Sequence, residues 1–314
     1  MRKLAVLLLV LLSATAAAQN YPTRTVRFVS GVTPGAASDT MARILAEKLS
    51  PILGQPVIVE NRLGAGGLVG ARYVAQQAEP DGHTIMMYAS AFTVSTLLTP
   101  GLDPKELAPV ATVATIPTVM ITPPGKYKTV AEFVSTAKAQ PGKLVCSDAG
   151  IGSATHMAFE RFRFAAGFEA LNVHTKGPGE AVTEILSGRA DCYFALIFQA
   201  HKLVDAGKVG ALVVSSPKRS SLMPNLPTTV EAGYPNSDYN FWVGALVAAK
   251  TPREIVERLH KEIDALVRSP DISDQIRKLG ADPLTLSIAE FDAMIKRELV
   301  ENAQLIKKAG ITAN

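Results

Sequence analysis

The chain has 314 residues, a length typical of two domains or one large domain, and its formal net charge is +4. Its 47% apolar and 19% charged residues exclude an intrinsically disordered chain, which would have fewer apolar residues and a higher net charge. Lysines and arginines are spread along the sequence rather than clustered, so we expect no nucleic-acid partner.

The N-terminus has the pattern of a secretory signal peptide. Arg2 and Lys3 precede an apolar run over residues 4–12, which is too short to span a bilayer, and the alanines at 16–18 fit the cleavage rule. We expect cleavage after Ala18, and no cysteine follows the run to carry a lipid anchor. Because no later apolar stretch is long enough for a membrane helix, the sequence predicts an exported, soluble, periplasmic protein.

The first part of the mature chain alternates predicted strands and helices. Strands are expected over residues 25–30, 57–60 and 84–88. Between them, one helix is expected from an N-cap at Ser38 or Asp39 to Pro51, and another over residues 68–78. This order predicts an α/β fold with a mainly parallel sheet and helices on both faces.

The same pattern restarts after residues 123–125, Pro-Pro-Gly, which we interpret as a crossing into a second domain. Further strands are expected over residues 144–147, 170–174, 190–197, 209–214 and 241–249. Further helices are expected over residues 156–165, 179–186, 252–267, 271–279 and 289–309. We expect the last helices to return to the first domain, so that residues 19–121 with 242–314 form domain 1 and residues 122–241 form domain 2.

Cys146 and Cys192 lie in apolar, strand-like segments. Export would place them in an oxidising compartment where a disulfide can form, and two buried free thiols are the alternative that we favour slightly. Neither cysteine has a histidine at zinc-ligand spacing, and His83, His174, His201 and His260 are scattered, so we expect no metal and no cofactor.

A loop of small residues follows a strand and precedes a helix in each half, over residues 31–39 and 148–155. In open α/β sheets, ligands bind outside the carboxyl ends of the strands, where these loops lie. A helix N-terminus offers unpaired N–H groups and a partial positive charge. Two such termini facing each other across a cleft would hold a small anion.

Several segments, in order along the mature chain, resemble the periplasmic solute-binding proteins of tripartite tricarboxylate transporters, the Bug family. They are Tyr21-Pro22-Thr23-Arg24, Glu60-Asn61-Arg62, Gly64-Ala65-Gly66-Gly67, Pro80-Asp81-Gly82-His83-Thr84, Leu226-Pro227-Thr228-Thr229 and Lys308-Ala309-Gly310-Ile311. The resemblance implies a two-domain Venus-flytrap protein of the second structural class. It also implies capture of a small carboxylate or related organic anion for two integral-membrane transporter subunits. We expect the receptor to be a monomer.

The loops, the ends of the strands and this resemblance together predict the ligand-binding residues. They are Thr33, Gly35, Ala36, Ser38, Asp39, Ser90, Ala91, Ile151, Gly152, Ser153, Thr155, Thr175 and Lys176. Lys176 is the expected charged contact. The chain departs from the family in its first loop, in residues 148–155, and at His174-Thr175, where the family has Pro-Tyr before Lys-Gly.

The sequence leaves two alternatives to a transport receptor. A receptor that presents its ligand to a membrane sensor would share the fold and the site. An exported hydrolase is disfavoured because the nucleophile motif G-x-S-x-G is absent and no acid is obviously placed to orient His156 beside Ser153. We therefore expect a binding protein and not an enzyme.

Overall fold

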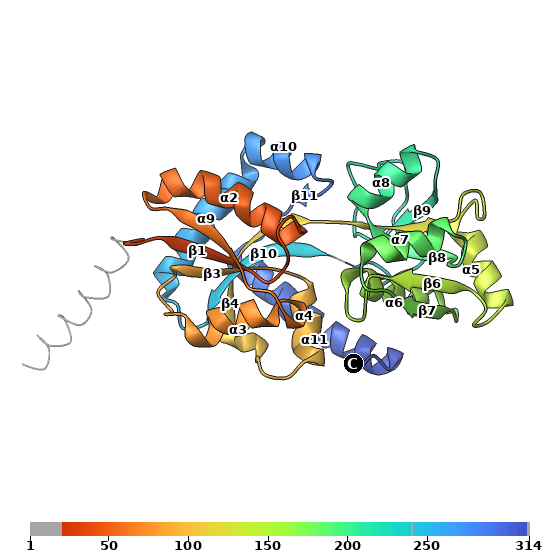
Figure 1. The fold of residues 1–314 in the computed structure, drawn as a ribbon, viewed down its shortest axis with the longest axis horizontal. Coiled ribbons are helices and arrows are strands. Elements are labelled where there is room, and N and C mark those ends of the chain that lie inside the picture. The colour runs from red at the N-terminus through yellow and green to blue at the C-terminus, as the bar shows by residue number, and fades with distance from the viewer. Residues whose placement is uncertain (1–20, 240, 313–314) are drawn as a thin grey trace, which may run out of the picture.

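The computed structural model describes residues 21–239 and 241–312, which form two lobes, each built on its own β-sheet (Figure 1). The strand order is β11-β4-β10-β3-β1-β2 in the first sheet and β7-β6-β8-β5-β9 in the second. The predicted signal peptide and its cleavage site lie outside the described residues. Within the described residues, no helix is both long and apolar enough to cross a membrane.

The strands of the first sheet are β1 (Val26–Ser30), β2 (Val57–Asn61), β3 (Thr84–Ala89), β4 (Leu107–Thr115), β10 (Trp242–Ala248) and β11 (Asp282–Pro283). Neighbouring strand residues alternate between two cores, because successive side chains of a strand point to opposite faces. Phe28 and Met87 pack on one side with α2 (Ala37–Leu53) and α9 (Arg253–Arg268). Val29 and Met86 pack on the other with α3 (Leu68–Arg72) and α11 (Ile288–Ala309).

The strands of the second sheet are β5 (Thr118–Thr122), β6 (Val145–Asp148), β7 (Leu171–His174), β8 (Cys192–Leu196) and β9 (Gly210–Val214). On one face, α5 (Val130–Ala139) and α6 (Ala154–Ala166) bury an aromatic core that includes Phe133, Phe159 and Phe162. The other face is covered by α7 (Pro178–Leu186) and α8 (Ile197–Asp205). The remaining helices are η1 (Ala65–Gly67), η2 (Tyr73–Gln77), α4 (Ala91–Leu98), η3 (Pro104–Glu106) and α10 (Pro270–Lys278).

Both sheets are mixed, whereas the sequence predicted mainly parallel ones. Among the named strands of the described residues, the parallel pairs are those within β2-β1-β3 and β7-β6-β8, the strands that the βαβ pattern identified. The antiparallel part comes from β4 and β5, which the prediction missed, and from β10. The helix predicted over residues 68–78 is a short α-helix continued by one π-turn, η2.

Cys146 and Cys192 form a disulfide, so the expectation of free thiols was wrong. They are register partners on the adjacent parallel strands β6 and β8, and their Cα atoms are 4.6 Å apart. This separation lies within the range that a disulfide spans. The two cysteines are 46 residues apart in the sequence, so their pairing becomes evident only from the register of β6 and β8.

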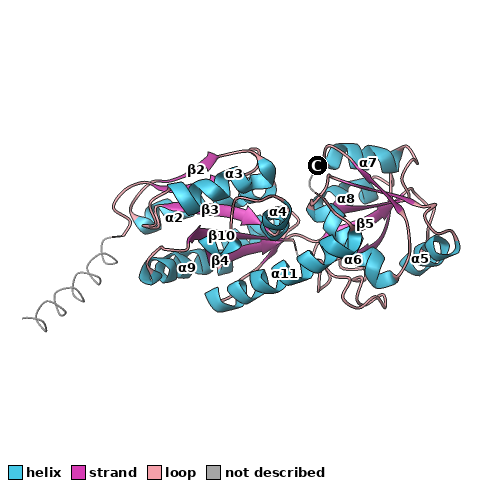
Figure 2. Cartoon of the chain, turned by 90° about the horizontal axis from the view of Figure 1, so that it is seen from below, coloured by secondary structure: helices cyan, strands magenta, loops and turns pink. Residues whose placement is uncertain are grey.

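The chain crosses between the sheets twice. It leaves the first sheet at the end of β4, Thr115, and enters the second at Thr118; it returns between Val214 and Trp242. The predicted boundary at 121/122 would divide β5, so we propose to place the first crossing at residues 116–117. In addition, α11 extends from beneath the first lobe to α6 of the second (Figure 2).

Candidate functional site

Two adjoining cavities lie where the lobes meet. The larger, about 540 Å³, is lined from the first lobe by residues 65–66 and α4, and from the second by residues 149–153 and 174–176. The smaller, about 200 Å³, lies between residues 31–38 and β3, with Leu196 and Phe241 also in its wall. Gly66 and Ala91 line both cavities, so the two cavities are adjacent.

The N-terminus of α2 faces the smaller cavity. Its N-cap is Ala36, which has no side chain able to cap, so the expected cap at Ser38 or Asp39 was wrong. Ala37 and Ser38, in the first turn of α2, line the cavity. First-turn N–H groups have no partner within their own helix and carry a partial positive charge, so this end of the cavity suits an anion.

Asp39 is buried and stabilises the first loop instead of capping the helix. Its carboxylate accepts hydrogen bonds from Gly35 N (2.8 Å), Asn61 Nδ2 (2.7 Å) and the Arg43 guanidinium (2.9 and 3.0 Å). Burial opposes ionisation, but these bonds, that of Arg43 foremost, hold the pKa of Asp39 below its usual value. The carboxylate is therefore charged, neutralised by Arg43, and outside the cavity lining.

The second loop has its amides bonded to its own side chains. Ser153 Oγ accepts from His156 N (3.2 Å), Thr155 Oγ1 from Ala149 N (2.9 Å), and His156 Nδ1 from Gly152 N (3.0 Å). These bonds rigidify the loop but leave it fewer free donors than the sequence argument assumed. Donors to a ligand on this side must come mainly from side chains.

Two residues of the second lobe that have a cationic or ionisable side chain line the larger cavity, His174 and Lys176. Lys176 is exposed, and its backbone N–H donates to Glu180 (2.9 Å) while no ion pair of its ammonium is found among the described residues. The hydroxyl of Thr175 is bonded to backbone oxygens of Asp148 (2.7 Å) and Gly177 (2.9 Å). Thr175 therefore shapes the cavity with its backbone more than with its hydroxyl.

A cluster of Asp148, His156 and His174 was not anticipated. Their possible metal-ligating atoms lie within 4.8 Å of one another. However, His174 Nδ1 is 2.8 Å from Asp148 Oδ2, and His156 Nδ1 accepts from Gly152 N. A neutral His156 that accepts at Nδ1 carries its proton on Nε2, which removes that lone pair from metal binding. The cluster is therefore a hydrogen-bonded support for the loop.

His156 is almost fully buried, and burial lowers its pKa to about 4. It is therefore neutral at pH 7. Its backbone N–H, not its imidazole, contacts Ser153, whose hydroxyl also lies 3.0 Å from Thr155 Oγ1. This arrangement does not pair a serine nucleophile with a histidine base.

The structure divides the predicted site residues into three groups. Those in the lining of one or both cavities are Ala36, Ser38, Ala91, Ile151, Gly152, Ser153, Thr175 and Lys176. Thr33 and Gly35 are exposed in the first loop, outside the lining. Asp39, Ser90 and Thr155 are buried behind it, and Ser90 Oγ is 3.2 Å from the hydroxyl of Tyr239.

Sequence reasoning missed residues that line the larger cavity from the first lobe, above all Ser95, Leu98 and Thr99. They belong to or follow α4, a helix that was not predicted. The signal was present, because α4 follows β3 as α2 follows β1. His174 was singled out as a departure from the family pattern but was not included among the predicted ligand-binding residues.

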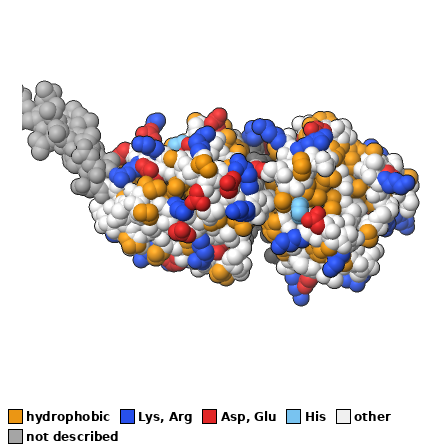
Figure 3. Space-filling view, turned by 90° about the horizontal axis from the view of Figure 1, so that it is seen from above, with side chains coloured by type: hydrophobic (Ala, Val, Ile, Leu, Met, Phe, Trp, Pro, Cys, Tyr) orange, Lys and Arg blue, Asp and Glu red, His pale blue; other side chains and the backbone are white. Residues whose placement is uncertain are grey.

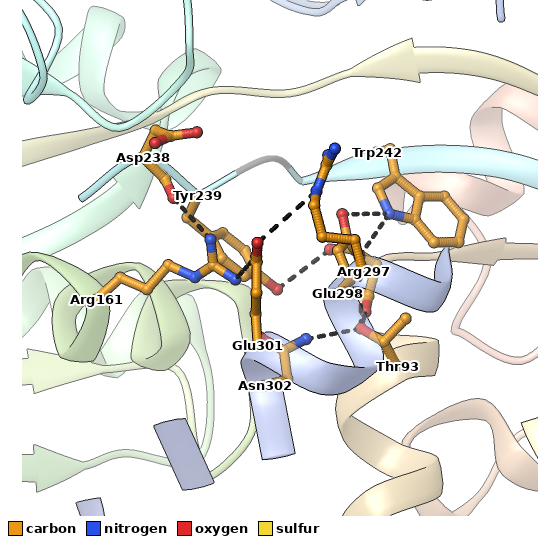
Figure 4. A network of polar contacts seen from close by, with 10 residues as sticks. Thr93, Arg161, Asp238, Tyr239, Trp242, Arg297, Glu298, Glu301 and Asn302 are labelled. Atoms are coloured by element: carbon orange, nitrogen blue, oxygen red, sulfur yellow. Dashed lines mark hydrogen bonds and ion pairs between the residues drawn. The ribbon is translucent and has the colours of Figure 1, made fainter. Parts of the chain in front are cut away.

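A polar network joins residues of the two lobes (Figure 4). Arg161 of α6 donates to Glu301 of α11 (2.7 Å) and to the backbone oxygen of Asp238 (3.1 Å). Trp242, at the start of β10, donates to Glu298 of α11. These contacts lie at the second chain crossing, where a relative motion of the lobes would have to be accommodated.

On the face seen in Figure 3, basic and acidic side chains are interspersed over both lobes.

The chain is similar to known proteins along almost its whole length. It is 33% identical to a "UPF0065 protein in tcbD-tcbE intergenic region" of Pseudomonas sp. strain P51, covering 83% of this chain and 79% of that protein. It is 29% identical to "Protein BugT" of Bordetella pertussis, covering 95% and 93% of the two chains.

Two solved structures from Rhodopseudomonas palustris are also similar. One, Rpa4515 with adipate, has a TM-score of 0.79 and 29% identity, covering 93% of this chain and 99% of that one. The other, MatC with bound malate, has a TM-score of 0.74 and 27% identity, covering 91% and 100%. The model of the family described as "Tripartite tricarboxylate transporter family receptor" matches residues 41–311. The chain therefore belongs to this family of periplasmic solute-binding receptors, as the resemblance implied.

Proposed function

We propose that this protein captures a small carboxylate-containing ligand between its lobes and delivers it to two integral-membrane subunits of a tripartite transporter. The observation that carries the proposal is the pair of adjoining cavities. The uncapped N-terminus of α2 lies at one end, and His174 and Lys176 of the second lobe lie at the other. Export by the predicted signal peptide and action as a monomer belong to the same proposal.

The chemistry of the walls matches such a ligand. A carboxylate at the N-terminus of α2 would accept from backbone N–H groups without needing an arginine. Met87, Leu196 and Phe241 offer apolar surface to a carbon chain in the smaller cavity. A second acidic group would then meet the cationic side chains across the larger cavity. The adipate and malate in the two related structures, both dicarboxylates, support this ligand class.

Capture needs no chemical step on the ligand. A ligand that contacts both lobes binds the closed arrangement better than the open one and shifts the population toward it. The chain crossings at residues 116–117 and 215–241 are where the lobes would hinge. The membrane subunits would then recognise the closed form.

The first test is a thermal-stability screen of residues 19–314, unfolded and refolded to remove any ligand carried through purification. The panel holds C4–C6 dicarboxylates, citrate, aromatic acids and acidic amino acids. A ligand at a hundred times its Kd should stabilise the fold by about 2.7 kcal/mol, which raises Tm by several degrees. If a folded, ligand-free protein shows no shift with any of them, the carboxylate assignment is wrong.

A matched pair of variants locates the site. Ala91→Phe places a ring at the junction of the two cavities and should abolish the shift caused by a panel ligand. Ala131→Phe adds the same ring on an exposed position of α5, outside both cavities, and should leave the shift intact. Equal shifts in the two variants would place the ligand elsewhere.

A further inference from the structure

We propose that His174, held by Asp148, is the second-lobe contact for the distal carboxylate of a dicarboxylate ligand, and that binding loads a proton onto its Nε2 atom. The inference deepens the proposed function and rests on it.

The orientation of the His174 imidazole is fixed by its contact with Asp148. His174 and Asp148 are register partners at the ends of the parallel strands β7 and β6, and His174 Nδ1 lies 2.8 Å from Asp148 Oδ2. Asp148 is fully buried, and its other oxygen accepts from Gly150 N at 2.7 Å. A carboxylate partner makes Nδ1 the donor, so Nε2 is the nitrogen left for other contacts.

The side chain of His174 is accessible to a ligand. It is 38% exposed and lines the larger cavity together with Lys176. A neutral imidazole with its proton on Nδ1 has only a lone pair at Nε2, which repels a carboxylate. Protonation turns Nε2 into a charged donor, the kind of hydrogen bond that carboxylates accept most strongly.

Charged and titratable groups of both signs surround His174. Asp148 of β6 is the anion in direct contact, and Lys176 follows on the same chain segment. From α7, Glu180 accepts from the backbone N–H of Lys176. On α6, the ring of His156 contacts the His174 ring at a centroid distance of 4.8 Å.

Apart from Lys176, the remaining residues that line the two cavities beside His174 bring no unpaired charge. Glu160 of α6 shares a cavity of about 210 Å³ with His174, but its carboxylate is bonded to Arg163 at 2.7 Å. Residues 309–312, which line the same cavity, and the α4 residues across the larger cavity carry no ionisable side chain. Burial lowers the pKa of His156 to about 4, so the buried imidazole of the pair is neutral at pH 7 and brings no charge to His174.

Calorimetric titration of residues 19–314 with adipate, malate and succinate at pH 6, 7 and 8 tests the inference. Hexanoate and butyrate serve as ligands with one carboxylate. An imidazole changes charge between about pH 5 and 8. We expect dicarboxylate affinity to be about tenfold higher at pH 6 than at pH 8, the change that one charged hydrogen bond brings. Monocarboxylate affinity should not change.

Repeating the pH 7–8 titrations in buffers of different ionisation enthalpy should show net proton uptake with dicarboxylates.

Three variants assign the effect. His174→Asn keeps a donor to Asp148, removes Nε2, and should lose both the pH dependence and the proton uptake. His201→Asn is the matched control, because His201 also holds an aspartate, Asp205, through Nδ1 at 2.9 Å but lies outside both cavities. Glu298→Gln removes the buried carboxyl whose pKa is raised to about 7. Both controls should keep the pH dependence.

The outcomes separate the two proposals. Dicarboxylates that bind with affinity independent of pH, or a His174→Asn variant that keeps the tenfold change, overturn the role of His174 and leave the receptor function standing. If no carboxylate binds the folded wild-type protein at any pH, the proposed function fails and this inference with it.

Discussion

The indole nitrogen of Trp242 lies 3.0 and 2.9 Å from the two carboxylate oxygens of Glu298, deep between β10 and α11. Trp242 is fully buried and Glu298 is 8% exposed. The indole N–H and a long contact from Thr93 Oγ1 (3.5 Å) do not offset the loss of hydration of a whole carboxylate, and burial raises the pKa of Glu298 to about 7. A group at the second chain crossing therefore changes charge near neutral pH.

Glu298 makes the free energy of unfolding fall as the pH rises toward neutrality. Between the ordinary value of 4.5 and about 7, the folded protein binds a proton at Glu298 that the unfolded chain has released, so raising pH favours unfolding. The free energy of unfolding of the wild type should drop by about 3 kcal/mol relative to Glu298→Gln between pH 4.5 and 8. Denaturant unfolding of both proteins across this range measures it. Parallel pH profiles would contradict the assignment.

The sequence predicted the βαβ part of each lobe well because local patterns determine it. The strands that match β1, β2 and β3 are short apolar runs bounded by Gly, Pro and polar turns. In contrast, β4 and β5 follow each other with only residues 116–117 between them and pair in different sheets. No local pattern marks a chain that leaves one sheet for another, so both strands were missed.

The candidate site was predicted in its loops but not in its hydrogen bonding. The position of residues 148–155 beside the cleft follows from topology alone. Whether its amides stay free depends on side chains such as Thr155 and His156 folding back onto them, which is a tertiary property. The pairing of His174 with Asp148 likewise depends on strand register, which spacing in the sequence does not show.

The disulfide should contribute strongly to stability. It closes a sequence separation of 46 residues, and a loop of that length predicts about 4 kcal/mol in the chain-entropy account. The double variant Cys146→Ala/Cys192→Ala should lose about this much free energy of unfolding while still binding the same ligand below its lowered Tm. Thiol titration of the denatured, unreduced wild type should find no free thiol. If two thiols can be titrated, Cys146 and Cys192 are free thiols, which is the alternative that the sequence slightly favoured.

Lys176 should contribute to affinity rather than to folding. Lys176 is exposed and lines the larger cavity, and a charged hydrogen bond to a ligand carboxylate corresponds to about tenfold in affinity. Lys176→Gln should raise the Kd for a dicarboxylate by that factor with Tm unchanged. Lys138→Gln, on the exposed face of α5, removes the same charge far from the cavities and should leave the Kd unchanged. Equal Kd values for the two variants would show that Lys176 points away from the ligand.

Gly31 should be intolerant of any side chain because two backbones meet there. A Cβ on Gly31 would lie 2.4 Å from the Cα of Gly67 and 2.9 Å from its oxygen, and both residues line the smaller cavity. Gly31→Ala must push residues 65–67 outward, which should cost about 1–3 kcal/mol of stability and lower ligand affinity at least tenfold by opening the cavity wall. Gly179→Ala is the control, since a Cβ there meets nothing within 4 Å on α7, and alanine favours a helix. Calorimetry and unfolding of both variants measure the two effects. Unchanged affinity in a destabilised Gly31→Ala protein would mean that the ligand does not depend on this wall.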